Sequence, residues 1–425
     1  MKRRSHGFVP NVSRRQFLAA SLAGMARLSV NPAFAQVLSA RKFRVAAINS
    51  IFRLRSHAYH IVGRMVFGFQ KDGVHHQPNL QVVRMMNDQT PRDDLSPPFC
   101  QRHGIELVKT VAEALGGPGG LDVDAVALIC EHGDYPVNEF GQILYPRYEL
   151  FQQIVQVFQK SNKSVPVFVD KHLSFDHTKA AMMVAMAKKL GFPLMAGSSL
   201  PVTWRVPQVE LPRASPLVEG VCTFGYDRGI AEIYLFHALE VLQCMLERRR
   251  GGETGVKTVT CLQGDAVWKA CDEGRITWSL VEESIGRCPS ANVGPIRENV
   301  LKPMAILLEY ADGTRGAVLN LIEAVSEFGF AGRLKDQKEP VSCLFHLPEP
   351  PGARFFDPLT YQIEQHFHGH QPYPVERTLL TSTVLDLALH SLKDASRPIS
   401  NAALAIQYQP PTSSGFFRGP VMDRH

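Results

Sequence analysis

The sequence predicts an α/β fold, in which a doubly wound parallel sheet is followed by an α+β domain with a largely antiparallel sheet. Short β-branched and aromatic runs alternate with amphipathic helical patterns up to about residue 200, as in strands joined by crossover helices. Beyond that point strand-like runs dominate. The 425 residues also exceed the usual size of one hydrophobic core. We therefore expect domains at 42–200 and 201–425, preceded by a separate segment at 1–35.

The first 35 residues contain six Lys and Arg and no Asp or Glu. The run from Ser13 to Leu18 matches a twin-arginine pattern, a short apolar run continues to Ala26, and Ala33-Phe34-Ala35 has the form of a cleavage site. An ordinary basic amphipathic helix would not explain these three features in this order. We expect a twin-arginine signal peptide that is cleaved near Ala35, and therefore a periplasmic or otherwise exported protein.

The charge of the remaining chain is balanced. Of the 46 Lys and Arg, 40 lie after residue 35, against 40 Asp and Glu in the whole chain. This balance gives no electrostatic argument for a nucleic-acid partner or an anionic membrane. No later apolar run approaches the roughly 20 residues needed to span a bilayer. The eight cysteines show no C-x-x-C pair and no zinc-like spacing, so buried thiols are expected and a disulfide stays open.

The elements of the first domain are predicted from hydrophobic periodicity. Its strands share short apolar, β-branched or aromatic runs, at 43–49, 80–86, 125–130, 165–169 and 193–197. Its helices share apolar residues at helical spacing, at 56–67, 105–115, 147–159 and 174–190. Gly117 to Gly120 predicts a turn, and 131–146 predicts a loop. This alternation predicts a parallel sheet with helices on both faces.

One stretch, from Val165 to Arg205, organises the predicted site. The apolar run at 165–169 ends abruptly at three polar residues, Asp170, Lys171 and His172. A helix that Ser174 is expected to cap follows, and a further strand ends at Gly197. Because the carboxyl ends of strands in an open parallel sheet line the ligand crevice, we expect these three side chains to lie in a functional site.

This sequence of strand, acidic-Lys-X, capped helix and second strand resembles the Gfo/Idh/MocA family, which includes glucose-fructose oxidoreductase and inositol dehydrogenases. That family carries Glu-Lys-Pro here, with the lysine near the nicotinamide and the substrate hydroxyl, whereas this chain has Asp170-Lys171-His172. The resemblance implies a Rossmann-like first domain, a catalytic Lys171, and a cofactor contact for all three residues. The alternative is that Lys171 is an ordinary solvated lysine at the end of a strand, without a catalytic role.

The first strand-to-helix turn departs from the pattern that binds a dinucleotide. Such a turn uses G-x-G-x-x-G, because glycines let backbone amides approach the pyrophosphate. Here the turn from Asn49 to Ser56 contains no glycine. The resemblance implies NAD or NADP, with Asn49, Ser50 and Arg53 as turn contacts. Asp88, after the second strand, is a further candidate for the ribose hydroxyls.

A long helix predicted at 229–250 carries three candidate catalytic residues of the second domain. The resembled family shows Asp-X-Gly-X-His-X-X-Asp on this helix, with the first Asp and the His in acid–base roles. His237-Ala238-Leu239-Glu240 preserves the His-X-X-acid part, while Ile233 occupies the place of the first acid and Glu232 stands one residue earlier. The resemblance implies that His237 transfers protons. Glu240, one turn later, could orient the imidazole or could equally be a surface charge. A satisfied core histidine is the alternative.

The rest of the second domain is predicted to be rich in strands, at 219–224, 257–262, 304–310, 316–322 and 341–347. Asp312-Gly313 predicts a hairpin turn between two of them. A last helix at 378–392 is expected to pack back on the first domain, and the sheet could support a homo-oligomer. His366, His368 and His370 could share one face of an extended segment. A solvated polar loop is expected there rather than a metal site, because no established ligand spacing accompanies them.

These observations favour an exported Gfo/Idh/MocA-like oxidoreductase that acts on a sugar or polyol with a nicotinamide cofactor. Two alternatives stay open. The same fold could carry out a non-redox lyase or hydrolase step on a glycoside, or it could bind a carbohydrate without catalysis. The turn without glycine favours both alternatives, while the twin-arginine pattern favours a cofactor, since such export carries folded proteins.

Overall fold

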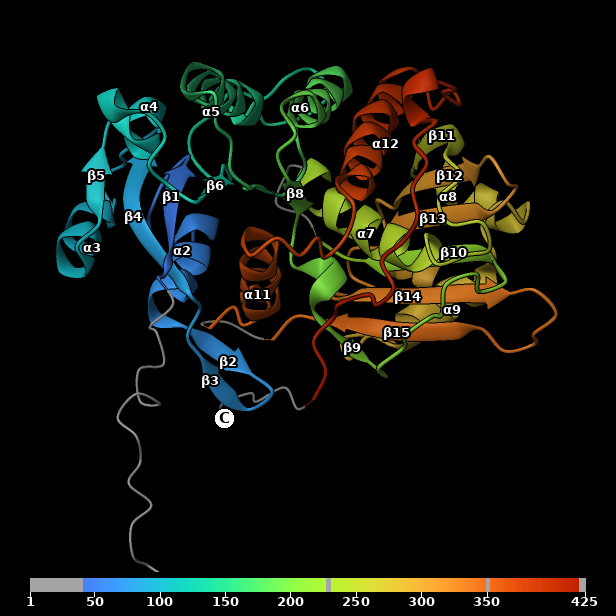
Figure 1. The fold of residues 1–425 in the computed structure, drawn as a ribbon. Coiled ribbons are helices and arrows are strands. Elements are labelled where there is room, and N and C mark those ends of the chain that lie inside the picture. Colours follow the sequence, from blue (N-terminus) through green and yellow to red (C-terminus); the bar gives the residue numbers. More distant parts are fainter. Residues whose placement is uncertain (1–40, 227–230, 349–351, 420–425) are drawn as a thin grey trace, which may run out of the picture. The chain divides into compact units, whose positions relative to one another are not determined.

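The computed structural model describes residues 41–226, 231–348 and 352–419. The predicted signal peptide lies outside the described residues. The chain from Phe43 onward forms one compact unit that contains two large sheets. Their arrangement confirms the predicted fold class (Figure 1).

The first sheet has six parallel strands in the order β5-β4-β1-β6-β7-β8 (Figure 1). Its strands are β1 (Phe43–Asn49), β4 (Leu80–Asn87), β5 (Glu106–Val108), β6 (Ala125–Ile129), β7 (Val167–Asp170) and β8 (Leu194–Gly197). Its helices are α2 (His57–Phe67), α3 (Ser96–His103), α4 (Val111–Leu115), α5 (Arg147–Ser161) and α6 (His177–Leu190). A small hairpin, β2 (Phe69–Lys71) with β3 (Val74–His76), follows α2.

Alternate residues of β1 show why helices cover both faces of this sheet. Val45 and Ala47 pack in one apolar cluster with residues of α2 and α3. Ala46 and Ile48 pack in another cluster with residues of α4, α5 and α6. Because side chains alternate across a strand, an entirely apolar strand needs cover on both sides.

Two sequence predictions in this half were wrong in detail. The predicted helix at 105–115 divides into β5 and α4, because Thr110 and Glu113 form a capping box that starts α4 at Val111. Helix α6 begins at His177, since Asp176 accepts from the backbone of Thr178 and Lys179. Ser174, the predicted cap, instead accepts from the backbone N–H of Asp176.

The second sheet has seven strands in the order β11-β12-β13-β10-β14-β15-β9. Its pairs are antiparallel except for the parallel pair β10 and β13. The strands are β9 (Trp204–Val206), β10 (Leu217–Phe224), β11 (Val256–Gln263), β12 (Met304–Tyr310), β13 (Arg315–Asn320), β14 (Phe328–Leu334) and β15 (Val341–His346). The helices that accompany them are α7 (Ala231–Leu246), α8 (Asp265–Asp272), α9 (Trp278–Gly286) and α10 (Ile296–Asn299).

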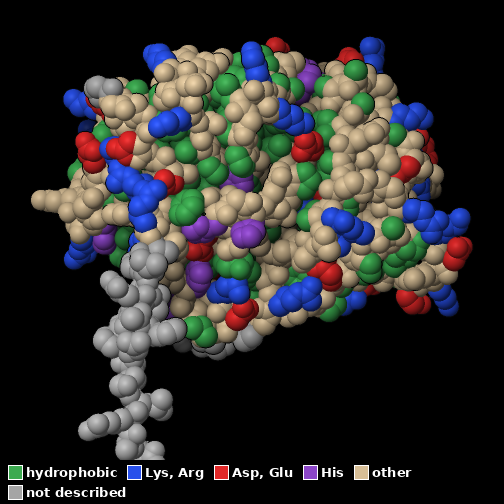
Figure 2. All heavy atoms as spheres, in the orientation of Figure 1, with side chains coloured by type: hydrophobic (Ala, Val, Ile, Leu, Met, Phe, Trp, Pro, Cys, Tyr) green, Lys and Arg blue, Asp and Glu red, His purple; other side chains and the backbone are tan. Residues whose placement is uncertain are grey.

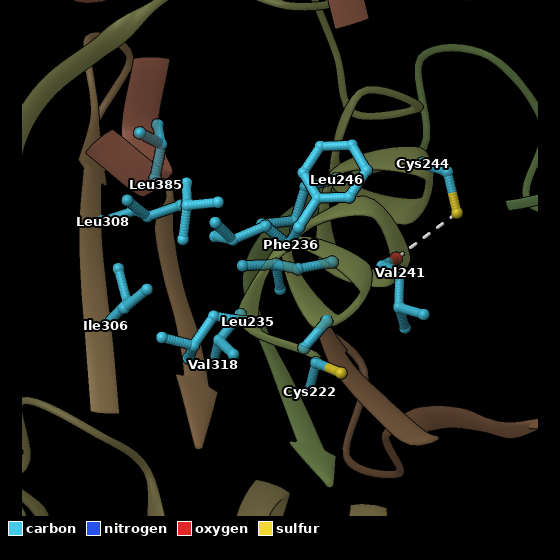
Figure 3. Packing of buried hydrophobic residues seen from close by; sticks show 14 of the residues in the cluster. Cys222, Leu235, Phe236, Val241, Cys244, Leu246, Ile306, Leu308, Val318 and Leu385 are labelled. Atoms are coloured by element: carbon cyan, nitrogen blue, oxygen red, sulfur yellow. Dashed lines mark hydrogen bonds between the residues drawn. The ribbon is translucent and has the colours of Figure 1, made fainter. Parts of the chain in front are cut away.

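The main core of the second half lies between this sheet and two helices, α7 and α12 (Val375–Lys393). Leu235 and Phe236 of α7 lie in one buried cluster with Ile306 of β12, Val318 of β13 and Leu385 of α12 (Figure 3). A separate apolar cluster joins α8 and α9 to the same sheet. The second sheet is therefore covered on both faces.

The C-terminal helices return to the first sheet. Thr378 Oγ1 donates to the carbonyl oxygen of Ala196 at 2.6 Å, and Leu173 N donates to Ser382 Oγ at 3.2 Å. Through these bonds α12 contacts the ends of β7 and β8. A preceding helix, α11 (Phe356–Phe367), was not predicted. It corrects the extended segment proposed at His366, which is buried in the last turn of α11.

The charges on the surface are mixed, and the cysteines are buried, as the sequence predicts. Figure 2 shows basic and acidic side chains interspersed over the face drawn, with histidine side chains gathered near α11. All eight cysteines are buried and unpaired. Within the described part of the chain, no helix combines the length and apolar character needed to cross a membrane, and no cluster of metal-ligating side chains is found.

Candidate functional site

Lys171 lies directly after β7, and its side chain is almost fully buried between the two halves of the chain. Its Nζ atom is 2.7 Å from Nε2 of His237 on α7 and 3.4 Å from Oε1 of Glu131. The backbone of Lys171 has φ of +67°, and its N–H donates to the carbonyl oxygen of Gly197 at 3.2 Å. A left-handed lysine is uncommon and costs conformational energy, as residues at functional sites often do.

His237 is connected to Glu240 through a serine that the sequence did not indicate. Ser198 follows β8, and its Oγ atom lies 2.9 Å from Nδ1 of His237. The same hydroxyl donates to Oε2 of Glu240, and Ser198 N donates to Oε1 at 2.8 Å. The direct separation of His237 Nδ1 and Glu240 Oε2 is 3.4 Å. Glu240 thus supports the imidazole mainly through Ser198.

The electrostatics of these groups follow from their burial. Burial and the charge of Lys171 lower the pKa of His237 well below its ordinary value, so its imidazole is neutral at pH 7. Burial raises the pKa of Glu240 to about 7, although two hydrogen bonds from Ser198 oppose that rise. Glu240 can therefore take up or release a proton near neutral pH.

A second set of buried polar side chains extends from Glu131 away from Lys171. Arg147 Nη2 donates to Glu131 Oε2 at 2.7 Å, and Arg147 Nη1 lies 3.2 Å from His172 Nε2. Because a guanidinium only donates, Nε2 of His172 accepts this bond. Glu232 Oε1 lies 3.3 Å from the same nitrogen, while its Oε2 accepts from the backbone N–H of Ile143 at 2.9 Å. The predicted catalytic residue Glu232 thus meets His172 rather than His237.

Burial and neighbouring charges determine the protonation states in this second set. Burial alone would raise the pKa of Glu131, but Lys171 and Arg147 outweigh it and hold that pKa below its ordinary value. Burial and Arg147 lower the pKa of His172. Glu131 is therefore ionised beside Lys171.

Asp170 is fully buried beside the start of α2. Its Oδ2 atom lies 2.7 Å from Nδ1 of His57, the first residue of that helix. The ring of His132 is 5.4 Å from the ring of His57, between centroids. Burial, followed by the charge of His57, lowers the pKa of His132 to about 4. These residues fill the carboxyl end of β7 next to Lys171.

The turn between β1 and α2 is closed by apolar and capping contacts. The side chains of Ile51 and Phe52 are buried, and the Phe52 ring packs 4.9 Å from the Phe99 ring, between centroids. Ser56 caps α2, and its Oγ atom accepts from the backbone of Arg53 and of Tyr59. The helix terminus that would face a pyrophosphate already has a side-chain acceptor.

The predicted cofactor contacts at this edge are engaged with other groups of the protein. Asn49 donates to Asn87 at 3.0 Å, and Ser50 Oγ donates to the carbonyl oxygen of Glu131 at 3.0 Å. The guanidinium of Arg53 lies 3.6 Å from the carboxylate of Asp93.

The segment that follows β6 covers the end of β4. Asp88 accepts from the hydroxyl of Tyr135 at 2.7 Å. Gln89 and Asp134 exchange two hydrogen bonds, each of 2.9 Å. With Phe52 in the core and Tyr135 on Asp88, the residues at this edge do not fit a dinucleotide held by the backbone of a glycine-rich turn.

Aromatic rings lie beside His237, which keeps slightly more exposure than Lys171 or Glu240, with 8% of its surface accessible. Tyr234 and Phe328 have ring centroids 6.3 Å from the His237 ring. Tyr226 stacks on Tyr234 at 4.1 Å. The rings of these tyrosines therefore place apolar faces beside the Lys171–His237 pair.

The parallel six-stranded sheet, followed by a mixed and mostly antiparallel seven-stranded sheet, is the Gfo/Idh/MocA fold. No family model and no curated protein sequence matches this chain. Among solved structures, GenD2 from gentamicin A biosynthesis in complex with NAD is similar at a TM-score of 0.53 and 13% identity, over 85% of this chain and 97% of that chain.

Two inositol dehydrogenases, one of them putative, share the fold at a similar level of structural similarity and sequence identity. A putative myo-inositol dehydrogenase from Sinorhizobium meliloti 1021 gives a TM-score of 0.52 at 12% identity, over 85% of this chain and 100% of that chain. Scyllo-inositol dehydrogenase from Lactobacillus casei, with bound NAD(H) and scyllo-inositol, gives 0.51 at 12% identity, over 84% of this chain and 99% of that chain. At such identities the comparison establishes the fold.

Several residues of this site were missed in the sequence. Glu131 follows β6 and Ser198 follows β8, so the rule that strand ends line the crevice would have included both. Arg147 and His57 are the first residues of helices and carried no comparable signal.

Proposed function

We propose that this protein is an enzyme that transfers a proton to or from an oxygen atom of a sugar or polyol, in a lyase or hydrolase step without net redox. The observation that carries this proposal is the 2.7 Å separation of Lys171 Nζ and His237 Nε2 at the junction of the two sheets. An ammonium group next to a neutral imidazole is a pair that can exchange one proton in either direction.

In this proposal one member of the Lys171–His237 pair donates a proton and the other accepts one. The ammonium group of Lys171 forms an ion pair with Glu131 at 3.4 Å and can donate to an oxygen that leaves the substrate. His237 is neutral at pH 7, because burial and Lys171 lower its pKa, and it can accept a proton at Nε2. The substrate class is supported by the tyrosines beside His237 and by the fold shared with a scyllo-inositol complex.

A reaction without redox is favoured by the edge where a dinucleotide would bind. Phe52 occupies the turn, and Tyr135 is bonded to Asp88. A nicotinamide-dependent oxidoreductase is the second candidate, and one observation favours it: the fold is shared with structures that contain NAD. In that case the same Lys171–His237 pair would remove the hydroxyl proton.

The test separates the two candidates. Mature protein is denatured in acid, and the supernatant is analysed by mass and by absorbance at 260 nm and 340 nm, while NAD and NADP are titrated into native protein by calorimetry. We expect no released nucleotide and no saturable binding. Released NAD(P), or saturable binding together with reduction during incubation with inositols, would overturn the non-redox proposal in favour of the second candidate.

We also propose that the chain is exported through its twin-arginine pattern. Replacement of Arg14 and Arg15 by Lys in the full-length protein should retain the folded product in the cytoplasm, as measured by cell fractionation. Unchanged export of that double variant would contradict this proposal.

A further inference from the structure

We propose that Ser198 and Glu240 complete a proton relay that connects Lys171, through His237, to a carboxylate enclosed in the protein. This inference rests on the proposed acid–base function, which requires Lys171 to exchange its proton. It assigns a role to Ser198, which reacts with no substrate atom itself.

The direction of each hydrogen bond in the relay follows from the groups that form it. An ammonium has no acceptor, so Lys171 Nζ donates to Nε2 of His237 across 2.7 Å. The neutral imidazole then carries its proton on Nδ1 and donates to Ser198 Oγ at 2.9 Å. The Ser198 hydroxyl donates to Glu240 Oε2. Each group thus donates to the next, from the lysine to the carboxylate.

A shift along this chain conserves every atom and leaves no charge in the middle. One N–H bond of Lys171 breaks as Nε2–H forms, Nδ1–H breaks as the Ser198 hydroxyl receives that proton, and the original hydroxyl proton passes to Glu240. The result is a neutral lysine amine, a neutral imidazole in the other tautomer, an intact serine and a protonated Glu240. The lysine amine can then accept the hydroxyl proton of a substrate, which breaks one O–H bond and forms one N–H bond.

Glu240 is surrounded by groups that make it a suitable terminus. Among the described residues, the titratable and polar groups that face it are Lys171 after β7, Ser198 after β8, His237 and Cys244 on its own helix, and Tyr373 and Arg377 near the start of α12. Burial is the largest influence and raises its pKa to about 7, against the hydrogen bonds of Ser198 and the charges of Lys171 and Arg377. Above that pH Glu240 is ionised and can accept the proton. Below that pH Glu240 is already protonated and cannot accept another.

Gly197 shows how closely this terminus is packed. A Cβ on Gly197 would lie 2.9 Å from Tyr373 Oη and 3.0 Å from Glu240 Oε1. Oε1 also accepts from Ser198 N at 2.8 Å, which fixes the carboxylate with its other oxygen toward the serine hydroxyl. The relay is therefore held by backbone contacts as well as by side chains.

The relay is tested on the mature protein without substrate, by nitrogen NMR of labelled histidine and carbon NMR of labelled glutamate carboxyls. Glu240→Gln and His237→Ala identify the two resonances. In the wild type we expect His237 to be protonated at Nδ1 and bare at Nε2, and Glu240 to titrate near pH 7. In Ser198→Ala the Glu240 midpoint should rise by about one pH unit, because a hydrogen bond to the charged form is lost.

Ser198→Thr is the matched control, since it restores the hydroxyl and should return the midpoint to the wild-type value. A wild-type His237 protonated at Nε2, or a Glu240 midpoint that Ser198→Ala leaves unmoved, would overturn the relay. If Ser198 had only a structural role, its replacement by Ala would destabilise the fold without changing the tautomer of His237 or the titration midpoint of Glu240. Because these measurements use no substrate, they can reject the relay without rejecting the proposed function. Equally, the proposed function can be rejected while the relay is confirmed.

Discussion

The guanidinium of Arg377 on α12 holds the carboxylate of Glu247, just beyond α7, through two parallel hydrogen bonds. Nε donates to Oε2 at 2.8 Å and Nη2 donates to Oε1 at 2.5 Å. The hydroxyl of Tyr408 donates to Oε2 at 2.8 Å. All three residues are buried or nearly so, and the pair fixes α12 against the helix that carries His237.

Arg377→Met should lower the free energy of unfolding by about 3–5 kcal/mol, because the buried Glu247 would lose its counter-charge. The measurement is urea unfolding at pH 7. Lys257→Met is the control, since Lys257 and Glu309 form an exposed pair at 3.3 Å whose loss should cost about 1 kcal/mol or less. A cost for Arg377→Met no larger than that of the control would show that the buried pair does not anchor α12.

Lys171→Met and His237→Ala should each lower turnover by about 100-fold or more, the scale of a positioned acid or base. Their combined loss should be far smaller than the product, since the two groups serve one proton transfer. Lys189→Met, on the exposed last turn of α6, is the control and should retain full turnover with an unchanged circular dichroism spectrum. An effect on KM alone would favour a binding protein without catalysis.

Gly197→Ala should disrupt the site. Its φ of +135° disfavours any side chain, and a Cβ there would meet Tyr373 and Glu240 at 3.0 Å or less. Gly104→Ala is the control, since it carries a φ of +65° with open space around the Cβ. The control should cost about 1 kcal/mol in unfolding free energy, and Gly197→Ala clearly more. Equal costs for the two variants would contradict the close packing around Glu240.

His366→Gln should make the protein less sensitive to acid. Burial lowers the pKa of His366 to about 4, while an unfolded histidine has a pKa near 6.5. The unfolded state binds the extra proton, so the contribution of His366 to stability is complete above about pH 6.5 and is lost as the pH falls toward 4.

The measurement compares urea unfolding at pH 7 and pH 5. Between these values His366 should account for about 2 kcal/mol of the stability that the wild type loses, and the Gln variant should lose less by that amount. His370→Gln, at an exposed position four residues later, should behave like the wild type. A wild-type loss that His366→Gln does not reduce would contradict the prediction.

Much of the fold could be predicted because its strands are continuous apolar runs. The run at 165–169 became β7, and its abrupt end at Asp170 placed Lys171 correctly at the edge of the sheet. Short or unusual elements were missed for physical reasons. Strand β5 has only three residues and exposes two of them, so it carries no hydrophobic period. The capping box at Thr110 then imposed a helix start inside the pattern that had been read as one helix.

The sequence alone determined the order of most strands and helices around the parallel sheet, the strand-end lysine, and the absence of glycine from the first turn. These are local properties, because hydrophobic period, caps and turn residues act over a few positions. Only the tertiary structure decided that Lys171 meets His237, 66 residues away, and that Ser198 stands between His237 and Glu240. Such pairings depend on how α7 packs against the end of the parallel sheet, and burial of the whole cluster then sets the pKa of Glu240.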